Sequence, residues 1–188
     1  MRKLIYLVGI SADGFIAASD GSADGFPLDP EVLGRIFTEY PETCPAHLRE
    51  ALAVTGEARH FDTVVMGYRT HEPALQAGLS SAYPHLRQYV VTHRGDLPPD
   101  PSLTVVHDHP VALVRDLKAQ PGRDVWLCGG ANLAGQLVDE IDEVHLKVYP
   151  VVFGSGVPLV SGSMAWTLLL VSSTPLGAGV LLNIYGRG

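Results

Sequence analysis

The chain has 188 residues, of which 46% are apolar and 18% charged, a composition that suits a folded domain with a full core. Its net charge of −7, without a block of Lys or Arg, excludes a protein that neutralises nucleic-acid phosphates. The two cysteines form no CxxC motif, which is typical of a reduced cytoplasmic protein. We therefore expect one domain over residues 1–188 that binds neither nucleic acid nor membranes.

The first apolar run, from Leu4 to Ile10, predicts a strand that is covered on both faces. Signal peptides also begin with charge and an apolar run. Here no small-residue cleavage site follows, and no run reaches the ~18 residues that span a bilayer. Residues 20–45 are rich in Gly, Pro and Asp around a helical stretch, Glu31 to Tyr40. This segment either covers a cleft or is a surface insertion.

The middle of the chain alternates short apolar runs with helical patterns. Thr63–Met66, Tyr89–Val91 and Val125–Leu127 are runs of the kind that form buried strands. Between the last two, the stretch from Val111 to Leu117 has apolar residues at helical spacing. This alternation predicts an α/β fold, with a mostly parallel sheet flanked by helices.

The last part of the chain has a different pattern. Glu143–Tyr149 alternates apolar and polar residues, which predicts a strand with one buried face. Thr167–Ser173 and Val180–Tyr185, joined through PLGAG, predict an antiparallel C-terminal hairpin, so the sheet is mixed. The apolar surface of these late strands predicts a twofold homodimer, unless the strands bury it within one monomer.

Three predicted strand ends carry residues that suit phosphate groups. Gly129 and Gly130 precede a helical pattern, where missing side chains let a phosphate approach the backbone and the positive end of the helix dipole. Gly67–Thr70 and Thr92–Arg94 follow two other strands and add hydroxyl and basic groups. Each stretch alone is equally an ordinary turn, with Thr70 as a helix cap. Because ligands of open α/β sheets bind beyond the carboxyl ends of strands, the three together predict a phosphate-rich cofactor.

The charge of the third turn indicates which cofactor this is. An NAD site places a carboxylate on the ribose 2′-hydroxyl, whereas an NADP site places an arginine near the 2′-phosphate. The turn offers His93 and Arg94. We therefore expect NADPH rather than NADH.

Four motifs resemble the dihydrofolate reductase superfamily: Asp13–Ala17, Val65–Thr70, Gly129–Leu133 and Asp142–Gly156. The branch they resemble most is the C-terminal reductase domain of the bifunctional riboflavin-biosynthesis deaminase-reductase. The resemblance covers nearly the whole chain in the correct order. It implies a mixed eight-stranded sheet, a homodimer, and NADPH-dependent hydride transfer to a small heterocyclic (pterin or pyrimidine-like) or carbonyl substrate. The alternative from another class is a nucleotide- or pterin-binding module without turnover.

The resemblance also implies roles for residues. Asp13 and Gly14 would lie near the nicotinamide, Lys147 would point toward the substrate, and Asp29 and Glu31 are positional candidates for the proton donor. The positions implied to bind the cofactor are Ile16, Gly67, Tyr68, Arg69, Thr70, Thr92, His93, Arg94, Gly129, Gly130, Ala131, Asn132 and Leu133.

The chain departs from the family pattern at two places. Tyr68 stands where the family has an arginine, which leaves Arg69 as a substitute. The Pro-Trp pair of dihydrofolate reductase before its acidic residue is missing from FPLDPEVLGRIF, which predicts a substrate other than dihydrofolate. The zinc deaminase signature is absent as well, so a riboflavin-like role would be confined to reduction.

Other polar or reactive residues have simpler interpretations. His107–His109 is expected to be a polar loop rather than a metal pair, because no further ligand is placed by the sequence. Cys128, Trp126 and Trp166 are expected in the core. No metal site is predicted.

Overall fold

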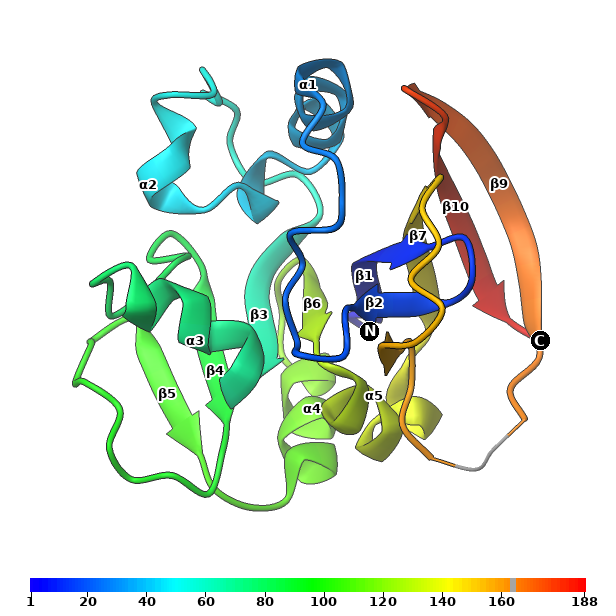
Figure 1. The fold of residues 1–188 in the computed structure, drawn as a ribbon. Coiled ribbons are helices and arrows are strands. Elements are labelled where there is room, and N and C mark those ends of the chain that lie inside the picture. The colour runs from blue at the N-terminus through cyan, green and yellow to red at the C-terminus, as the bar shows by residue number, and fades with distance from the viewer. Residues whose placement is uncertain (163–164) are drawn as a thin grey trace.

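The computed structural model describes residues 1–162 and 165–188 and shows a central twisted sheet between two layers of helices (Figure 1). The strands of this sheet lie in the order β5-β4-β3-β6-β1-β7-β10-β9. Their bounds are β1 Leu4–Ser11, β3 Phe61–Gly67, β4 Arg87–Val91, β5 Leu103–Val106, β6 Asp124–Gly129, β7 Glu143–Tyr149, β9 Leu168–Gly177 and β10 Val180–Arg187.

The strands from β5 to β7 in this order are all parallel, whereas β10 is antiparallel to β7, and β9 is antiparallel to β10. This confirms the predicted mixed, mostly parallel sheet with an antiparallel C-terminal hairpin. The parallel strands therefore end together along one edge of the sheet, here named the carboxyl edge. It is formed by Ser11, Gly67, Val91, Val106, Gly129 and Tyr149. The opposite edge, where these strands begin, is the amino edge.

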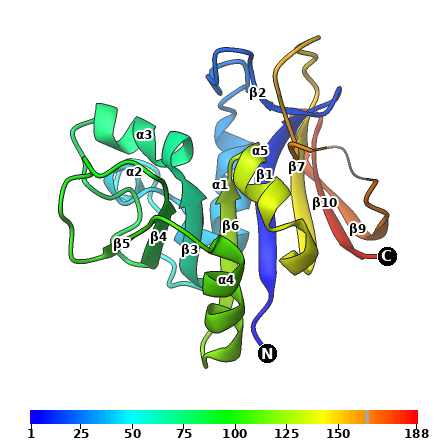
Figure 2. The ribbon, with the colours of Figure 1, turned by 90° about the horizontal axis from the view of Figure 1, so that it is seen from below.

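Helices cover both faces of the sheet. α1 (Pro30–Glu39) and α2 (Ala46–Arg49) lie on one side, and α4 (Pro110–Ala119) and α5 (Ala131–Gln136) on the other, as Figures 1 and 2 show. The remaining helix, α3 (Tyr68–Gln76), follows β3. On the α1 side, Ile5 and Leu7 of β1 share a core with Val32 and Ile36, whereas Leu4 and Tyr6 share a core with Val114 and Leu117 on the α4 side. β1 is thus covered on both faces, as its apolar run predicts.

Helix α1 begins one residue earlier than predicted because of its cap. Oδ1 of Asp29 accepts hydrogen bonds from the backbone N–H groups of Glu31 (2.9 Å) and Val32 (3.1 Å), and Pro30 takes the first helical position. A carboxylate at this position and a proline directly after it are the usual start of a helix. Asp29 is therefore engaged in the cap.

The hairpin at the end of the chain is tighter than the sequence predicts. β9 continues through Pro175 to Gly177, and only Ala178 and Gly179, both with positive φ, form the turn. Pro175 is compatible with a strand because β9 is the outermost strand of the sheet. Two short strands, β2 (Phe15–Ala17) and β8 (Val157–Pro158), form a separate two-stranded sheet that the sequence does not indicate.

Charged groups at the amino edge are closely paired. The carboxylate of Glu42, fully buried, accepts hydrogen bonds from the backbone N–H groups of Arg59 (3.2 Å), His60 (2.7 Å) and Phe61 (2.7 Å). Asp62 forms ion pairs with Arg2 and, at 3.2 Å, with Arg87. These contacts fix the start of β3 against the loop before it.

No helix within residues 1–162 and 165–188 has the length and apolar character needed to cross a membrane.

Candidate active site

Two glycine turns meet at the carboxyl edge. A Cβ built on Gly67 would lie 3.8 Å from both the carbonyl oxygen of Gly129 and the backbone nitrogen of Gly130. The hydroxyl of Thr70 would lie 3.8 Å and 3.6 Å from a Cβ on Gly129 and on Gly130. Gly129 has φ +118, and the peptide bond between the two glycines is cis. The turns after β3 and β6 thus present bare backbone on either side of one hydroxyl, as the sequence predicts.

Helix α5 after the second turn is shorter than expected. It spans Ala131–Gln136 and continues only as a 3₁₀ turn, so its dipole adds little to the site. The side chains of Ala131 and Leu133 are buried, while Asn132 accepts a hydrogen bond from Gln136 at 2.7 Å. These residues leave their backbone N–H groups, rather than their side chains, to contact a ligand.

Helix α3 begins at Tyr68, so Thr70 lies in its first turn and does not cap it. The prediction of a cap at Thr70 is wrong, because Gly67 takes the cap position without a side-chain bond. The Thr70 hydroxyl forms no hydrogen bond with the described residues, and exposed Arg69 has no ion-pair partner among them. Both groups remain available to an anion.

The turn after β4 is held in a defined shape. The hydroxyl of buried Thr92 accepts a hydrogen bond from the backbone N–H of Arg94 at 3.0 Å. The backbone carbonyl of Thr92 lies 2.8 Å from Nδ1 of His107. The guanidinium of Arg94 lies over the ring of Tyr68, 4.3 Å from its centre, and 3.4 Å from a carboxylate oxygen of Asp96. Tyr68 therefore supports an arginine from the turn after the neighbouring strand. His93 is exposed beside it.

Asp13 is engaged in a loop contact. Its carboxylate accepts hydrogen bonds from the hydroxyl of Ser11 (2.6 Å) and from the backbone N–H groups of Phe153 (3.1 Å) and Gly154 (2.7 Å). The Ser11 hydroxyl contributes most to holding the pKa of Asp13 below its usual value. These contacts join the loop after β1 to the loop after β7. A role of Asp13 in catalysis stays a prediction.

Glu31 and Ile16 lie on opposite sides of the sheet. Glu31 is in the first turn of α1, pairs with Arg35 at 2.9 Å and contacts Gly177 near the hairpin turn. Ile16, in β2, is half-buried against the core on the α4 side. Glu31 therefore does not adjoin Ile16, and its role as a proton donor stays a prediction.

Lys147 is on the α1 side of β7, between Gly9 of β1 and Leu182 of β10. Its side chain lies near the thiol of Cys128, and burial lowers its pKa. The ring of Tyr149, two residues further along the same face, lies 3.3 Å from a Cβ built on Gly9. Lys147 is thus close to the carboxyl edge, in mostly apolar surroundings.

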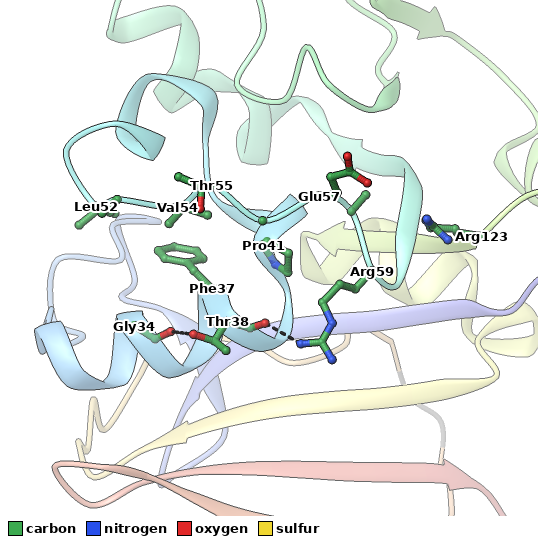
Figure 3. Close-up of a pocket in the computed structure, with 13 residues that line it drawn as sticks. Gly34, Phe37, Thr38, Pro41, Leu52, Val54, Thr55, Glu57, Arg59 and Arg123 are labelled. Atoms are coloured by element: carbon green, nitrogen blue, oxygen red, sulfur yellow. Dashed lines mark hydrogen bonds between the residues drawn. The ribbon is translucent and has the colours of Figure 1, made fainter.

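Cavities of the size of small-molecule sites lie elsewhere, and two of them adjoin α1. One, of about 790 Å³, opens between the end of α1 and residues 52–59 near the amino edge. Figure 3 shows that Arg59 points toward the carbonyl of Thr38, which it contacts at 2.7 Å. The other, of about 490 Å³, runs between α1 and the β9–β10 hairpin. Neither includes the glycine turns, so cavity size alone does not locate the strand-end site.

Within residues 1–162 and 165–188, no group of three or more His, Cys, Asp or Glu side chains is arranged to hold a metal ion.

Comparison with protein families decides what these turns belong to. The family described as the RibD C-terminal domain matches residues 2–182. The chain belongs to this family. Two uncharacterised members of the Bacillus subtilis (strain 168) proteome are similar to it. YwjB is 29% identical over 160 residues, which are 84% of this chain and 82% of YwjB. YyaP is 27% identical over 190 residues, which are 98% of this chain and 94% of YyaP.

Solved structures share the fold of this RibD C-terminal domain. A Shewanella sp. PV-4 protein with a suggested role in riboflavin biosynthesis has a TM-score of 0.70 at 21% identity, covering 100% of this chain and 99% of its own. Dihydrofolate reductase from Enterococcus faecalis, complexed with NADP(H) and RAB-propyl, has a TM-score of 0.68 at 16% identity, with coverage of 99% and 96%. At these identities the likeness shows the dihydrofolate reductase-like fold.

A third structure is a bifunctional protein. The Thermotoga maritima diaminohydroxyphosphoribosylaminopyrimidine deaminase/5-amino-6-(5-phosphoribosylamino)uracil reductase has a TM-score of 0.65 at 14% identity, and the match covers 100% of this chain but 57% of that one. The RibD C-terminal domain described here therefore corresponds to one part of a longer chain.

Some residues of this RibD C-terminal domain escaped the sequence prediction. The ring of Tyr83 packs edge-on against Trp126, with the ring centroids 5.0 Å apart. The ring centroid of Phe26 lies 5.0 Å from that of Tyr149 and 5.1 Å from that of Phe153. These contacts join segments far apart in sequence, so no local pattern indicates them. Cys128 is half-buried against the core on the α1 side, and Trp126 is a core residue as expected.

Proposed function

We propose that this chain is an NADPH-dependent reductase that transfers a hydride to a small heterocyclic (pterin or pyrimidine-like) or carbonyl substrate. The observation that carries the proposal is the meeting of the Gly67 and Gly129–Gly130 turns around the Thr70 hydroxyl, in a member of the RibD C-terminal domain family. Bare backbone at the carboxyl edge of an α/β sheet is where a dinucleotide phosphate is bound.

The residues present fit this cofactor. The backbone of Gly129–Leu133 and of Gly67 would hold the pyrophosphate, because no side chain of the glycines blocks its approach. The adenosine 2′-phosphate would lie near Arg94, which the Tyr68 ring supports. Exposed His93 adjoins Arg94 in the sequence, and exposed Arg69 adjoins Tyr68. In a chain of net charge −7, these basic groups supply a local attraction for the phosphate.

The chemistry is divided between cofactor and protein. When bound, the reduced nicotinamide supplies the hydride. The chain binds the dinucleotide, orients it with the help of the loop of Gly14 and Ile16, and excludes water from the α1 side through Phe26, Tyr149 and Phe153.

The alternative is a nucleotide- or pterin-binding module without turnover. Two observations favour it: the Asp13 carboxylate is engaged by Ser11, Phe153 and Gly154, and Glu31 is paired with Arg35 at the surface. Neither acidic side chain is placed as a free proton donor.

The experiment measures NADPH binding and NADPH oxidation on the same preparation. Fluorescence titration gives the affinity, and absorbance follows oxidation against a panel of pterins, pyrimidines and carbonyl compounds. Binding with substrate-dependent oxidation supports the reductase. Binding without oxidation by any compound supports the alternative, and absence of NADPH binding contradicts the proposed cofactor site.

A further inference from the structure

The turn after β4 carries a carboxylate beside its arginine. Nε of Arg94 lies 3.4 Å from Oδ1 of Asp96, and only Gly95 separates the two residues along the chain. The Arg94 side chain is 54% exposed and the Asp96 side chain 68% exposed, so both can contact a ligand from solvent. The turn therefore presents a negative group as well as a positive one.

The position of Arg94 within this turn is fixed from two sides. Its backbone N–H donates to the hydroxyl of Thr92 at 3.0 Å, and buried Thr92 donates its own N–H to the carbonyl of Val106 in β5 at 2.9 Å. The Arg94 guanidinium lies over the ring of Tyr68, 4.3 Å from its centre. Because the guanidinium is a small group and Asp96 lies against its Nε, any anion that binds Arg94 comes close to the Asp96 carboxylate.

The two nicotinamide cofactors differ in the group that would reach this turn. NADPH carries a phosphate on the 2′-oxygen of the adenosine ribose, whereas NADH carries a hydroxyl there. A hydroxyl can accept a hydrogen bond from a guanidinium and donate one to a carboxylate, so Arg94 and Asp96 together satisfy it. A phosphate carries more than one negative charge at neutral pH, so Arg94 attracts it while Asp96 repels it.

We propose that Asp96 is the specificity-determining residue of this turn, whose carboxylate limits the preference for NADPH by repelling its 2′-phosphate and by accepting a hydrogen bond from the 2′-hydroxyl of NADH. A repulsive group placed against one of two similar ligands is a general source of such discrimination. The preference keeps its sign, because Arg94 and exposed Arg69 both carry positive charge. This inference rests on the proposed function, since it assigns a role toward the cofactor of the same site.

The test compares the affinities of both cofactors for the wild type and for Asp96→Asn, which keeps the size of the side chain and removes its charge. Isothermal calorimetry at low ionic strength gives the dissociation constants. Asp96→Asn should bind NADPH about threefold more tightly and NADH about twofold more weakly, small changes because exposed charges interact through water. Asp96→Glu, which restores the charge, should return both affinities toward the wild-type values.

Salt dependence gives a second measurement. Because added salt screens exposed charges, the gain in NADPH affinity of Asp96→Asn should shrink when NaCl is raised from about 20 mM to about 500 mM. Asp116→Asn is the matched control, since it removes the same charge from an exposed position on α4. It should leave the affinities for both cofactors unchanged.

The outcomes separate this inference from a structural role and from the proposed function. A change in the shape of the turn would move both affinities in the same direction, whereas loss of the Asp96 charge should move them in opposite directions. Shifts in the same direction, or an unchanged ratio of affinities in a chain that binds NADPH, would overturn the role of Asp96 and leave the proposed function standing. If neither cofactor binds to the wild type or to Asp96→Asn, the proposed cofactor site fails and the role of Asp96 fails with it.

Discussion

The two edges of the parallel sheet treat polar groups in opposite ways. At the amino edge, Glu42 is satisfied by three backbone N–H groups, and Asp62 by Arg2 and Arg87. At the carboxyl edge, the Thr70 hydroxyl and the Lys147 ammonium have no partner among the described residues, and the glycine turns expose bare backbone. Neither of these two side chains is fully buried, so each can exchange water for a ligand, whereas the fully buried Glu42 carboxylate depends on its N–H partners. The amino edge stabilises the fold, and we propose that the carboxyl edge is left open for binding.

The largest effect on stability is expected when a buried hydrogen-bond acceptor at the amino edge is removed. Glu42→Ala should leave the buried N–H of Phe61 and the partly buried N–H groups of Arg59 and His60 without their acceptor, and so lower the free energy of unfolding by about 2–3 kcal/mol. Urea denaturation measures this loss. The folded variant should bind NADPH as the wild type does. Glu57→Ala, at an exposed position of the same segment, is the control. A loss below about 1 kcal/mol for Glu42→Ala would contradict the assignment.

The outer strand β9 has an edge that pairs with no other strand of the sheet among the described residues. Leu169, Leu170 and Val171 are 59%, 59% and 68% exposed, and β9 carries no charged residue to prevent pairing. We expect a twofold homodimer through this strand, with a mass of about 40 kDa by light scattering, twice the 20.1 kDa of the chain. Leu170→Lys should give the monomer, while Val152→Lys, at an exposed site outside β9, should not. A wild-type mass near 20.1 kDa at all micromolar concentrations would exclude the dimer.

A charged side chain placed on a glycine turn at the carboxyl edge should weaken cofactor binding more than it lowers the stability of the fold. Gly130 has no positive φ, and a Cβ there meets only the Thr70 hydroxyl at 3.6 Å, so Asp fits sterically. Its negative charge would lie where we place the pyrophosphate. Gly130→Asp should weaken NADPH binding by well over tenfold, or more than about 1.4 kcal/mol. Fluorescence titration measures this, with Gly34→Asp at an open site on α1 as the control. Unchanged affinity in a folded variant would remove the cofactor site from this turn.

A smaller effect is expected for the cofactor preference. The wild type should bind NADPH more tightly than NADH, and Arg94→Ala should narrow the difference by about tenfold or less. Tyr68→Leu should act in the same direction but more weakly, because it removes only the support under the guanidinium. Isothermal calorimetry with both cofactors tests this, and Arg35→Ala, on α1, serves as the control. Equal affinities in the wild type would show that the turn after β4 does not bind a 2′-phosphate.

The smallest effect concerns pH at the amino edge. Burial by itself raises the pKa of the Asp62 carboxylate. Hydrogen bonds from the Thr63 hydroxyl, the backbone N–H of Arg123 and the side chain of Arg87, together with the charge of Arg2, hold this pKa below its usual value. A lowered folded pKa adds stability above the unfolded pKa of about 3.9, and this stability is lost as the pH falls through the folded pKa. Asp62→Asn should therefore destabilise the chain at pH 7, with a gap to the wild type that shrinks toward pH 3. A gap that stays constant in urea denaturation would contradict this linkage.

The sequence predicts the fold well because the sheet depends on local patterns. The apolar runs before Gly67 and Gly129 mark two parallel strands, and the alternation in Glu143–Tyr149 marks the strand that changes the direction of its neighbours. The predicted meeting of the turns follows from the rule that parallel strands end at the same edge. The lengths of α5 and of the hairpin turn depend on packing, and were predicted less well.

The contacts that define the candidate site are mostly long-range, so the sequence alone could not give them. Tyr68 departs from the family pattern, and only the structure shows that it supports Arg94 from the turn after β4. The contact of Tyr83 with Trp126 depends on how a loop packs against the sheet. Glu42 lies in a 3₁₀ turn, Pro41–Thr43, between α1 and α2, and nothing in its neighbours along the chain indicates that it binds residues 59–61.

The Asp13 carboxylate has a consequence for how the chain tolerates changes in length. It fastens the loop after β1 to Phe153 and Gly154, and the strands that follow these loops, β2 and β8, pair with each other. A residue inserted between Asp13 and Phe15, or between Gly154 and Val157, would shift the Asp13 hydrogen bonds relative to the pairing of β2 with β8. Residues 20–24, largely exposed and outside helices and strands, form no hydrogen bond with the described part of the loop after β7. Length variation on this border of the molecule is therefore confined to the segment before Asp29, where an engineer can insert a tag or a loop without moving the end of β1.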